Sequence, residues 1–306
     1  MSKRSRTPRR LLMAATTTSV LTLALAACGS GTGSGHSSAM PGMDHGNRPS
    51  STAPADAMAS MPGMDTAATG NGLAAARDGY RMTSGTTGLP AGRSADYRFT
   101  VTGPDGRPVT DFTVDQTKRM HFYAVRTDLT GFQHLHPTMA QDGTWTAPLA
   151  ALRPGTWRLY TSFTPATGSG EGKDFVLSRT VKVSGMPMPT ALPKASGTTT
   201  VDGYTIAVKG DLTAGTAGRL TATVTENGKP VTDLQPYLDT YAHLTAFHQG
   251  DLSFAHLHPE TKVNGDHGGP TLTFHAEFAQ PGNWRLFLQF QTAGKLHTAA
   301  LTLHVN

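Results

Sequence analysis

Six histidines occupy matching places in two halves of the chain, at a spacing that suits a metal ion. The tripeptide His-Leu-His stands at 134–136 and again at 256–258, and a proline follows each copy. Alternate side chains of an extended strand share a face, so both histidines of each tripeptide project together. A further histidine precedes each tripeptide by thirteen residues. The two predicted ligand sets are His121, His134 and His136, and His243, His256 and His258.

Antiparallel pairing would bring each set together. A turn centred near Asp128 and Leu129 places His121 opposite His136, with Cβ atoms about 4.5–5.5 Å apart. The alternative is that these histidines are hydrogen-bonded at the rim of a sheet without a metal. Across 113–131 and 235–253 only the histidine and one alanine are identical between the halves. Because the surrounding residues have diverged, we favour metal binding over packing.

Other side chains could complete these sites. Candidate accessory ligands are Met120 beside the first set, and His248 and His267 near the second. His297 and His304 fall in the last predicted strand, and we expect them to face solvent.

Methionines in the segment 28–77 indicate which metal is bound. Met-Pro-Gly-Met-Asp occurs at 40–44 and 61–65, within a stretch of Gly, Ser, Thr, Ala and Pro that lacks the residues of a core. Such a composition predicts a disordered tether, in which methionine has no packing role. Thioethers prefer Cu(I), and imidazole accepts Cu(I), Cu(II) or zinc. Copper is therefore the predicted cofactor, with zinc as the alternative, although compositional drift would also explain the motif. The candidate tether ligands are Met40, Met43, His45, Met61 and Met64.

The first 27 residues carry all of the excess positive charge. The chain has a net charge of +5, and five of its 26 basic residues precede an uncharged run at 11–27. The remaining 21 basic residues balance 21 acids, which argues against nucleic-acid binding. Leu-Ala-Ala-Cys-Gly at 25–29 resembles the bacterial lipobox. The resemblance implies cleavage before Cys28 and a diacylglycerol on its sulfur, which would anchor the protein to the outside of the cell membrane. Because Cys28 is the only cysteine, disulfides and thiolate chemistry are then excluded.

The remainder of the chain is a tandem repeat. Short β-forming runs alternate with turns, without a helical period, and this pattern predicts two immunoglobulin-like β-sandwich domains in an all-β protein. Trp157 and Trp284 recur in a Pro-Gly-x-Trp-Arg motif and are expected in the two cores. The predicted division is a signal peptide at 1–27, the tether at 28–77, one sandwich at 78–184, a linker at 185–197 and a second sandwich at 198–306.

These motifs resemble known proteins. The methionine segments are similar to those of bacterial extracytoplasmic copper-resistance proteins, and the repeats with His-Leu-His-Pro are similar to lipoproteins of heavy-metal-binding type. That lipoprotein family has no assigned activity to carry over. From the methionine segments and the two histidine sets we predict a monomeric, non-enzymatic copper-binding lipoprotein that sequesters copper or delivers it to a copper-handling envelope protein. Two alternatives stay open: a metal-free interaction module of two immunoglobulin-like domains, and a zinc-dependent hydrolase. Against the hydrolase alternative, the two repeats have no carboxylate at matching positions that could act as a general base.

Overall fold

The computed structural model describes residues 70–306, which form strands, turns and loops and contain no helix. No helix in this part of the chain is therefore long and apolar enough to cross a membrane. The predicted signal peptide, the lipid site at Cys28 and the tether ligands Met40, Met43, His45, Met61 and Met64 lie outside the described residues. The predicted all-β class is confirmed for residues 70–306.

The strands follow the predicted runs closely. Those of the first domain are β1 (Ala76–Arg77), β2 (Tyr80–Thr83), β3 (Gly88–Leu89), β4 (Ala95–Thr102), β5 (His121–Arg126), β6 (Phe132–Leu135), β7 (Thr138–Met139), β8 (Thr144–Leu149), β9 (Gly155–Phe163) and β10 (Phe175–Val183). Those of the second are β11 (Thr198–Val201), β12 (Tyr204–Lys209), β13 (Ala217–Glu226), β14 (Lys229–Pro230), β15 (Ala242–His248), β16 (Phe254–Pro259), β17 (Thr271–Glu277), β18 (Gly282–Thr292) and β19 (Lys295–Val305).

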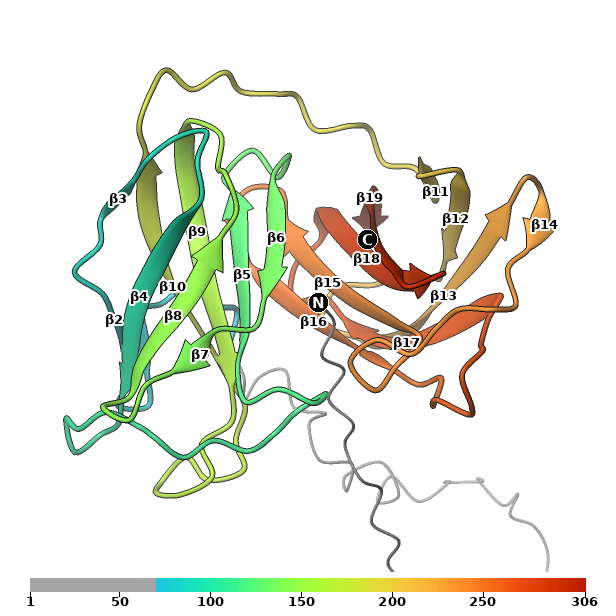
Figure 1. Ribbon diagram of the computed structural model, residues 1–306. Helices are drawn as coiled ribbons and strands as arrows, with labels where there is room; N and C mark the ends of the chain where they lie inside the picture. Colours follow the sequence, from blue (N-terminus) through green and yellow to red (C-terminus); the bar gives the residue numbers. More distant parts are fainter. Residues whose placement is uncertain (1–69) are drawn as a thin grey trace, which may run out of the picture. The chain divides into compact units, whose positions relative to one another are not determined.

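The first domain is a β-sandwich of two five-stranded sheets. One sheet has the order β1-β2-β4-β8-β7 and the other the order β3-β10-β9-β5-β6 (Figure 1). Along β4, Tyr97, Phe99 and Val101 are buried while the residues between them are more exposed, so one face of this strand meets the core. Trp157 lies in that core, as predicted, and its indole N–H donates to the carbonyl of Arg153.

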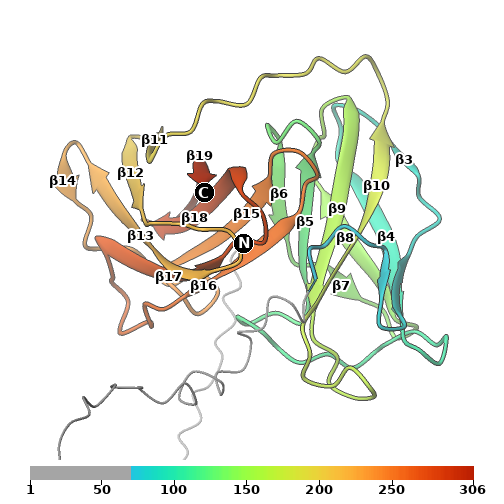
Figure 2. The ribbon, with the colours of Figure 1, turned by 180° about the vertical axis from the view of Figure 1, so that it is seen from behind.

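The second domain repeats this plan with its two sheets joined. The strand path runs β11-β12-β13-β17-β16-β15-β18-β19, with β14 added beside β13 (Figure 2). Strand β16 makes the join, because Leu257 pairs with β15 whereas His258 and Pro259 pair with β17. Proline lacks a backbone N–H and is therefore expected to end a strand ladder. Pro137 does separate β6 from β7, but Pro259 remains within β16 as that strand passes to the other sheet.

Local turn chemistry agrees with the sequence. Asn227 and Gly228 both have positive φ, at 50° and 76°, and connect β13 to β14. This is the two-residue hairpin turn that Asn-Gly favours. Trp284 is fully buried, and its indole N–H donates to the carbonyl of Gln280, four residues earlier, as Trp157 does in the first domain.

The outer face of one sheet from each domain is covered by the other domain. All six residues of β5 are buried, although a strand with one solvated face would alternate. Phe122 and Ala124 belong to the first domain's core, whereas Tyr123 and Val125 join an aromatic cluster with Phe247 and other residues of the second domain. Phe132 and Phe287 stack across this interface with ring centroids 4.1 Å apart. The two domains therefore belong to one compact unit.

Two extended segments hold the domains together, namely residues 71–73 and the linker. The backbone carbonyl of Asn71 accepts a hydrogen bond from Phe254 in the second domain, and that of Gly72 accepts one from the Ser178 hydroxyl in the first. Leu73 packs on the shared aromatic cluster. The last residues of the range assigned to the tether are thus bound to the folded domains, because their backbone and one leucine find partners there.

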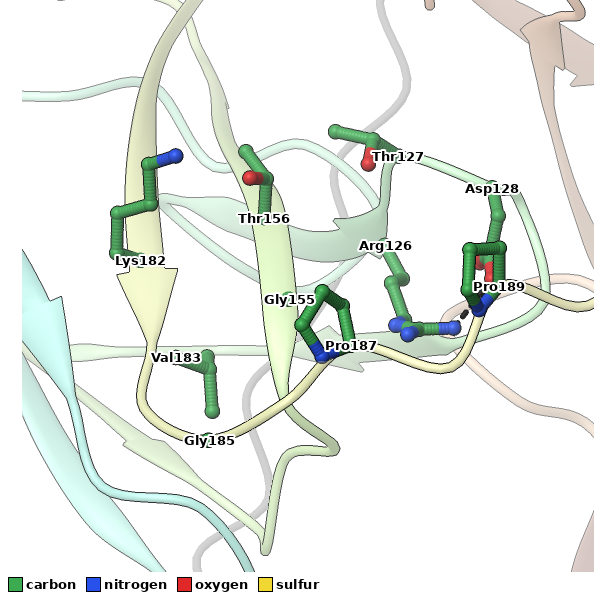
Figure 3. A pocket seen from close by; sticks show the side chains of 10 residues that line it. All are labelled: Arg126, Thr127, Asp128, Gly155, Thr156, Lys182, Val183, Gly185, Pro187 and Pro189. Carbon is green, nitrogen blue, oxygen red and sulfur yellow. Dashed lines mark hydrogen bonds and ion pairs between the residues drawn. The ribbon is translucent and has the colours of Figure 1, made fainter.

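The linker between the domains is fixed at its start by a buried arginine. Arg126 donates to the carbonyls of Pro154 and Met188 and forms an ion pair with Asp128. Figure 3 shows its guanidinium beside Pro187 and Pro189 of the linker, in a pocket walled by β9 and β10. The course of the linker over the first domain is therefore determined by this arginine.

The shared aromatic cluster should contribute strongly to stability. Phe247 is fully buried among residues of both domains, so Phe247→Ala should lower the free energy of unfolding by about 3 kcal/mol through lost burial and a cavity. Chemical denaturation measures this loss. Leu296→Ala, at a partly exposed position on β19, is the control. A loss no larger than that of the control would mean that the two faces are not packed in solution.

Candidate metal centre

The first predicted ligand set lies at the end of the β5–β6 pair. Phe122 pairs with Leu135 and Tyr123 with His134, so the next step of the register sets His121 opposite His136. The predicted pairing register is therefore confirmed. The ring centroid of His121 is 5.2 Å from that of His136 and 5.4 Å from that of His134. All three imidazoles lie on the side of the sheet that faces the second domain.

A histidine of the second domain joins them. His121, His134 and His243 each offer one ring nitrogen, and these three nitrogens lie within 4.8 Å of one another. We call these residues the inner trio. The ring of His243 stacks on that of His134, with centroids 4.6 Å apart. The sequence led us to expect one site in each repeat. The structure instead places His243 with the histidines of the first repeat, because the strands that carry them face each other across the interface.

Each ring of the inner trio has an oxygen acceptor on its outer side. His121 Nε2 lies 3.1 Å from the backbone carbonyl oxygen of Asp115, and His134 Nδ1 lies 2.7 Å from Gln289 Oε1. His243 Nδ1 lies 2.8 Å from Gln116 Oε1. An oxygen of a carbonyl can only accept, so each imidazole donates its N–H outward. Histidines that bind metals are oriented in this way by a second shell of acceptors.

This arrangement leaves bare nitrogens facing one another. If His121 donates from Nε2 and His134 from Nδ1, then His121 Nδ1 and His134 Nε2 both carry lone pairs, and they lie 3.1 Å apart. Two lone pairs at this distance repel unless a proton or a cation lies between them. Two nitrogens bound to one ion at about 2.0–2.1 Å lie roughly 2.9–3.4 Å apart for angles from square to tetrahedral. The spacing of this pair suits a shared metal ion.

Burial keeps these rings neutral, as ligands must be. Burial lowers the pKa of His121, and lowers the pKa of His134 well below its usual value with help from the charges of neighbouring histidines. Burial also raises the pKa of Tyr123 well above its usual value, so its hydroxyl stays protonated. This hydroxyl lies 3.2 Å from His243 Nε2, and an ion bound by that nitrogen would replace the contact. A proton is therefore a poor occupant of the gap, whereas a metal ion suits neutral imidazoles.

His136 borders the same space. Its Nε2 is buried and has no hydrogen-bond partner among the described side chains and backbone, and burial lowers its pKa to about 4. An unsatisfied buried ring nitrogen costs free energy unless a ligand or an ion completes it. His136 is thus placed as a fourth donor, with its centroid 4.8 Å from that of His134.

A strained turn supplies two of the outer acceptors. Asp115 and Lys118 exchange backbone hydrogen bonds around Gln116 and Thr117, whose φ angles are 43° and 68°. Left-handed φ at two successive non-glycine residues costs free energy and is common at functional sites. The turn directs the Asp115 carbonyl to His121 and the Gln116 amide to His243.

The second predicted set is divided. His243 belongs to the inner trio, and His258 pairs with His275 of β17 at the edge of the join between the sheets. Burial lowers the pKa of His258, while the carboxylates of Asp115 and Asp174 oppose this change. The backbone of His256 pairs with Thr245.

The accessory candidates lie elsewhere. Met120 is buried in the core of the first domain, with its sulfur against the Thr161 hydroxyl, because it points opposite to His121. His267 is exposed in the 264–269 loop. His304 is exposed, as expected, but His297 is buried between Asp202 and the Thr292 hydroxyl, so the expectation that it faces solvent was wrong. The Lys295–Asp202 ion pair covers that end of the hairpin.

His248 has a structural role that its neighbours explain. Its Nδ1 is 2.9 Å from Asp251, and its Nε2 is 3.2 Å from the carbonyl of Pro281. In the first domain the aligned residue is Arg126, which binds Asp128 and the carbonyl of Pro154 in the same way. Arg126 and His248 each connect the end of their strand to the loop that precedes the tryptophan-bearing strand, β9 or β18. Both nitrogens of His248 face these oxygens, whereas the rings of the inner trio also face one another, so His248 is not part of that group.

Three polar residues of the site were not found from the sequence. Gln289 pairs across the sheet with His243, and its counterpart in the first domain is Ser162 opposite His121. Gln116 and Tyr123 likewise differ from their counterparts in the other repeat. Only the facing of the two sheets gives these residues their role, and a single sequence carries no signal for that.

The family of the chain is shown by its two repeats. The family described as "Domain of unknown function (DUF8832)" matches residues 74–183 and again 199–306. The chain belongs to this family. Its two domains are therefore repeats of one domain, and both histidine sets lie within the matched ranges. No curated protein matches the chain by sequence.

Several solved structures share features of the fold. A DUF4426 family protein from Pseudomonas aeruginosa is 10% identical with a TM-score of 0.27, and the match covers 36% of this chain and 96% of that one. The Escherichia coli adhesin FdeC is 17% identical with a TM-score of 0.24, covering 76% of this chain and 65% of that one. The Ig1-2 module of the Drosophila receptor tyrosine phosphatase DLAR is 9% identical with a TM-score of 0.21, covering 74% and 98%. These likenesses give no information on function.

The Asp251 network should stabilise the protein in a pH-dependent way. Burial alone would raise the pKa of Asp251, but hydrogen bonds from Ser253, Gln280 and His248 hold it well below its usual range. The ionised carboxylate therefore stabilises the folded state above the unfolded pKa near 4, and this stabilisation is lost as pH falls below it. Asp251→Asn should lower the free energy of unfolding at pH 7 by about 1 kcal/mol, the carboxylate being partly exposed.

Denaturation of wild type and Asp251→Asn between pH 7 and pH 3 measures this difference. The two proteins should converge in stability as pH falls. Asp266→Asn, in the exposed 264–269 loop, is the control and should not change stability. A difference that grows on acidification would contradict the assignment.

Proposed function

We propose that this protein binds a copper ion in a single site shared by its two domains, outside the cytoplasm. The inner trio supplies three neutral imidazoles, and His136 supplies a fourth. The carrying observation is the pair of ring nitrogens, His121 Nδ1 and His134 Nε2, that face each other at 3.1 Å while the other nitrogen of each ring lies against an oxygen. The function would be sequestration of copper or its delivery to an envelope partner.

The donor set favours a late first-row metal. Neutral imidazoles suit copper and zinc rather than magnesium or calcium, which prefer oxygen ligands. The methionine motifs at 40–44 and 61–65 select copper between these two, because thioethers bind Cu(I). Thioether and imidazole groups can bind copper in the oxidising environment outside the cell, where thiolates would be oxidised.

Location and anchoring are part of this proposal. The lipobox-like sequence before Cys28 supports lipidation and attachment to the outer side of the cell membrane. The protein would act as a monomer whose methionine segment collects Cu(I) and whose folded domains hold it. We propose binding rather than catalysis, since the ring nitrogens of the site are directed toward one another within a buried interface.

Copper titration of the chain tests the shared site. Wild type should bind one ion per chain in the folded domains, in addition to any held by the methionine segment. His134→Ala should abolish tight binding of this ion, because it removes one of the two facing nitrogens. Competition with a chromogenic copper chelator measures stoichiometry and affinity. His267→Ala, at an exposed position outside the site, is the matched control.

The outcomes separate the hypotheses. Two equivalent ions lost independently by His134→Ala and His243→Ala would indicate one site per repeat rather than a shared site. Unchanged stoichiometry in His134→Ala, or a folded wild type that binds neither copper nor zinc, would refute the metal proposal and leave a metal-free interaction module.

The outer acceptors should tune affinity without binding the ion. Gln289→Leu removes the oxygen that orients His134, and loss of such a partner typically weakens metal binding by about 10–100-fold. Gln289→Glu keeps an oxygen acceptor at the same place and should retain affinity. Equal weakening by both substitutions, measured by the same competition, would indicate a packing effect instead of orientation.

A further inference from the structure

A row of polar side chains crosses the second domain toward the inner trio. His275 of β17 pairs with Arg219 of β13 on one side and with His258 of β16 on the other. On the next strands His243 pairs with Gln289. The β15–β16 register, which pairs Leu244 with Leu257, sets His243 opposite His258 at its next step. Cross-strand neighbours share a face, so the register places His275, His258 and His243 in one row on the same face.

We propose that His258 and His275, the outer pair, form a second metal site that accepts the ion and passes it to the inner trio. This inference rests on the proposed function of the inner trio. The ion would leave one imidazole as it gains the next, without a change in oxidation state and without a covalent step.

Exposure differs among the histidines of the row and the inner trio. His275 and His258, like His134 and His136 of the first repeat, are half-buried, whereas His243 is 1% exposed and His121 is 3% exposed. An ion cannot reach the inner trio without shedding its water, which is unfavourable unless ligands replace that water in steps. Neighbouring imidazoles with Cβ atoms about 4.5–5.5 Å apart provide such steps.

The charges around the outer pair suit a cation. The carboxylates of Asp115 and Asp174 act on His258 across the domain interface. The positive charge of Arg219, which neighbours His275, is paired with Glu260 at 2.8 Å. A separate pocket reaches His121 from the first domain, and its lining holds two bases, Lys118 and Arg119, and two acids, Asp115 and Asp174. The register of the strands singles out the row through His275.

The outer pair exists in only one repeat. In the first domain, Thr138 pairs with Thr146, and the same register sets His136 opposite Pro148. Proline offers no ligand, so the first repeat has no counterpart of His275. His258 corresponds to His136 and is one of the duplicated histidines, so His275 is the residue that distinguishes the outer pair.

The rate of copper transfer tests the proposal. Cu(II) is moved from a chromogenic chelator to the full chain, and back to a stronger chelator, in stopped-flow experiments. His275→Gln should slow both directions by an equal factor of about tenfold and leave the equilibrium affinity unchanged, because a step on the path alters the barrier only. His304→Gln, exposed and hydrogen-bonded to Asn283, is the control and should transfer at the wild-type rate.

A second measurement tests binding at the outer pair directly. In His134→Ala, which disables the inner trio, weak Cu(II) binding should remain, and addition of His275→Gln should abolish it. Unchanged transfer rates in His275→Gln, or weak binding that survives the double substitution, would overturn the proposal. Failure of the proposed function would give a different result, because wild type would then show no tight copper binding at equilibrium. The proposed transfer route would be refuted by that result as well.

Discussion

The packing of one sheet face against another is the constraint on which the rest of this molecule depends. A β-sandwich needs only one apolar face on each sheet, yet β5 is buried along its whole length because its second face meets the other domain. The aromatic cluster around Phe247 and Tyr123 supplies the hydrophobic area of that contact. The histidines lie at the border of that contact. Burial there excludes water from their rings, but the protein does not supply a hydrogen-bond partner for every ring nitrogen. Their neutrality and their outward hydrogen bonds follow from that position.

A ligand at such a border couples the domains. His121 and His134 come from one domain and His243 from the other, so an ion that binds all three binds only the docked arrangement. Binding to one state of an equilibrium stabilises that state, by about 2.7 kcal/mol when the free ligand is at 100 times its Kd. The linker held by Arg126 and the segment held through Asn71 act in the same direction without a ligand. The interface is therefore fixed by covalent connection, apolar packing and, in our proposal, coordination.

Sequence reasoning succeeded where the cause is local. Alternation predicted the strands, Asn-Gly predicted the hairpin at 227–228, and a turn near Asp128 predicted that His121 lies opposite His136. It failed where the cause is the contact between domains. Each repeat was treated as complete, so His243 was assigned to its own site, and Gln116 and Gln289 were passed over as ordinary polar residues. His248 was taken as a candidate ligand because the sequence does not show its contacts. Its ring binds Asp251 nearby and the carbonyl of Pro281, which lies 33 residues later in the chain.

Duplication explains why two ligand sets meet in one place. Copies of a domain carry the same histidines on the same strand pair, and when those strand pairs face each other the copies converge on one interface rather than forming two sites. Because the histidines of both copies lie at one interface, each copy does not need its own full set of residues around the histidines. One repeat keeps Ser162 where the other has Gln289, and one has Pro148 where the other has His275. The first repeat thus supplies most of the proposed donors, while the second supplies the acceptor that lies against His134 and the row of histidines through His258 and His275. A symmetric pair of domains could bind an ion, but its asymmetry is what would allow the ion to enter from one side.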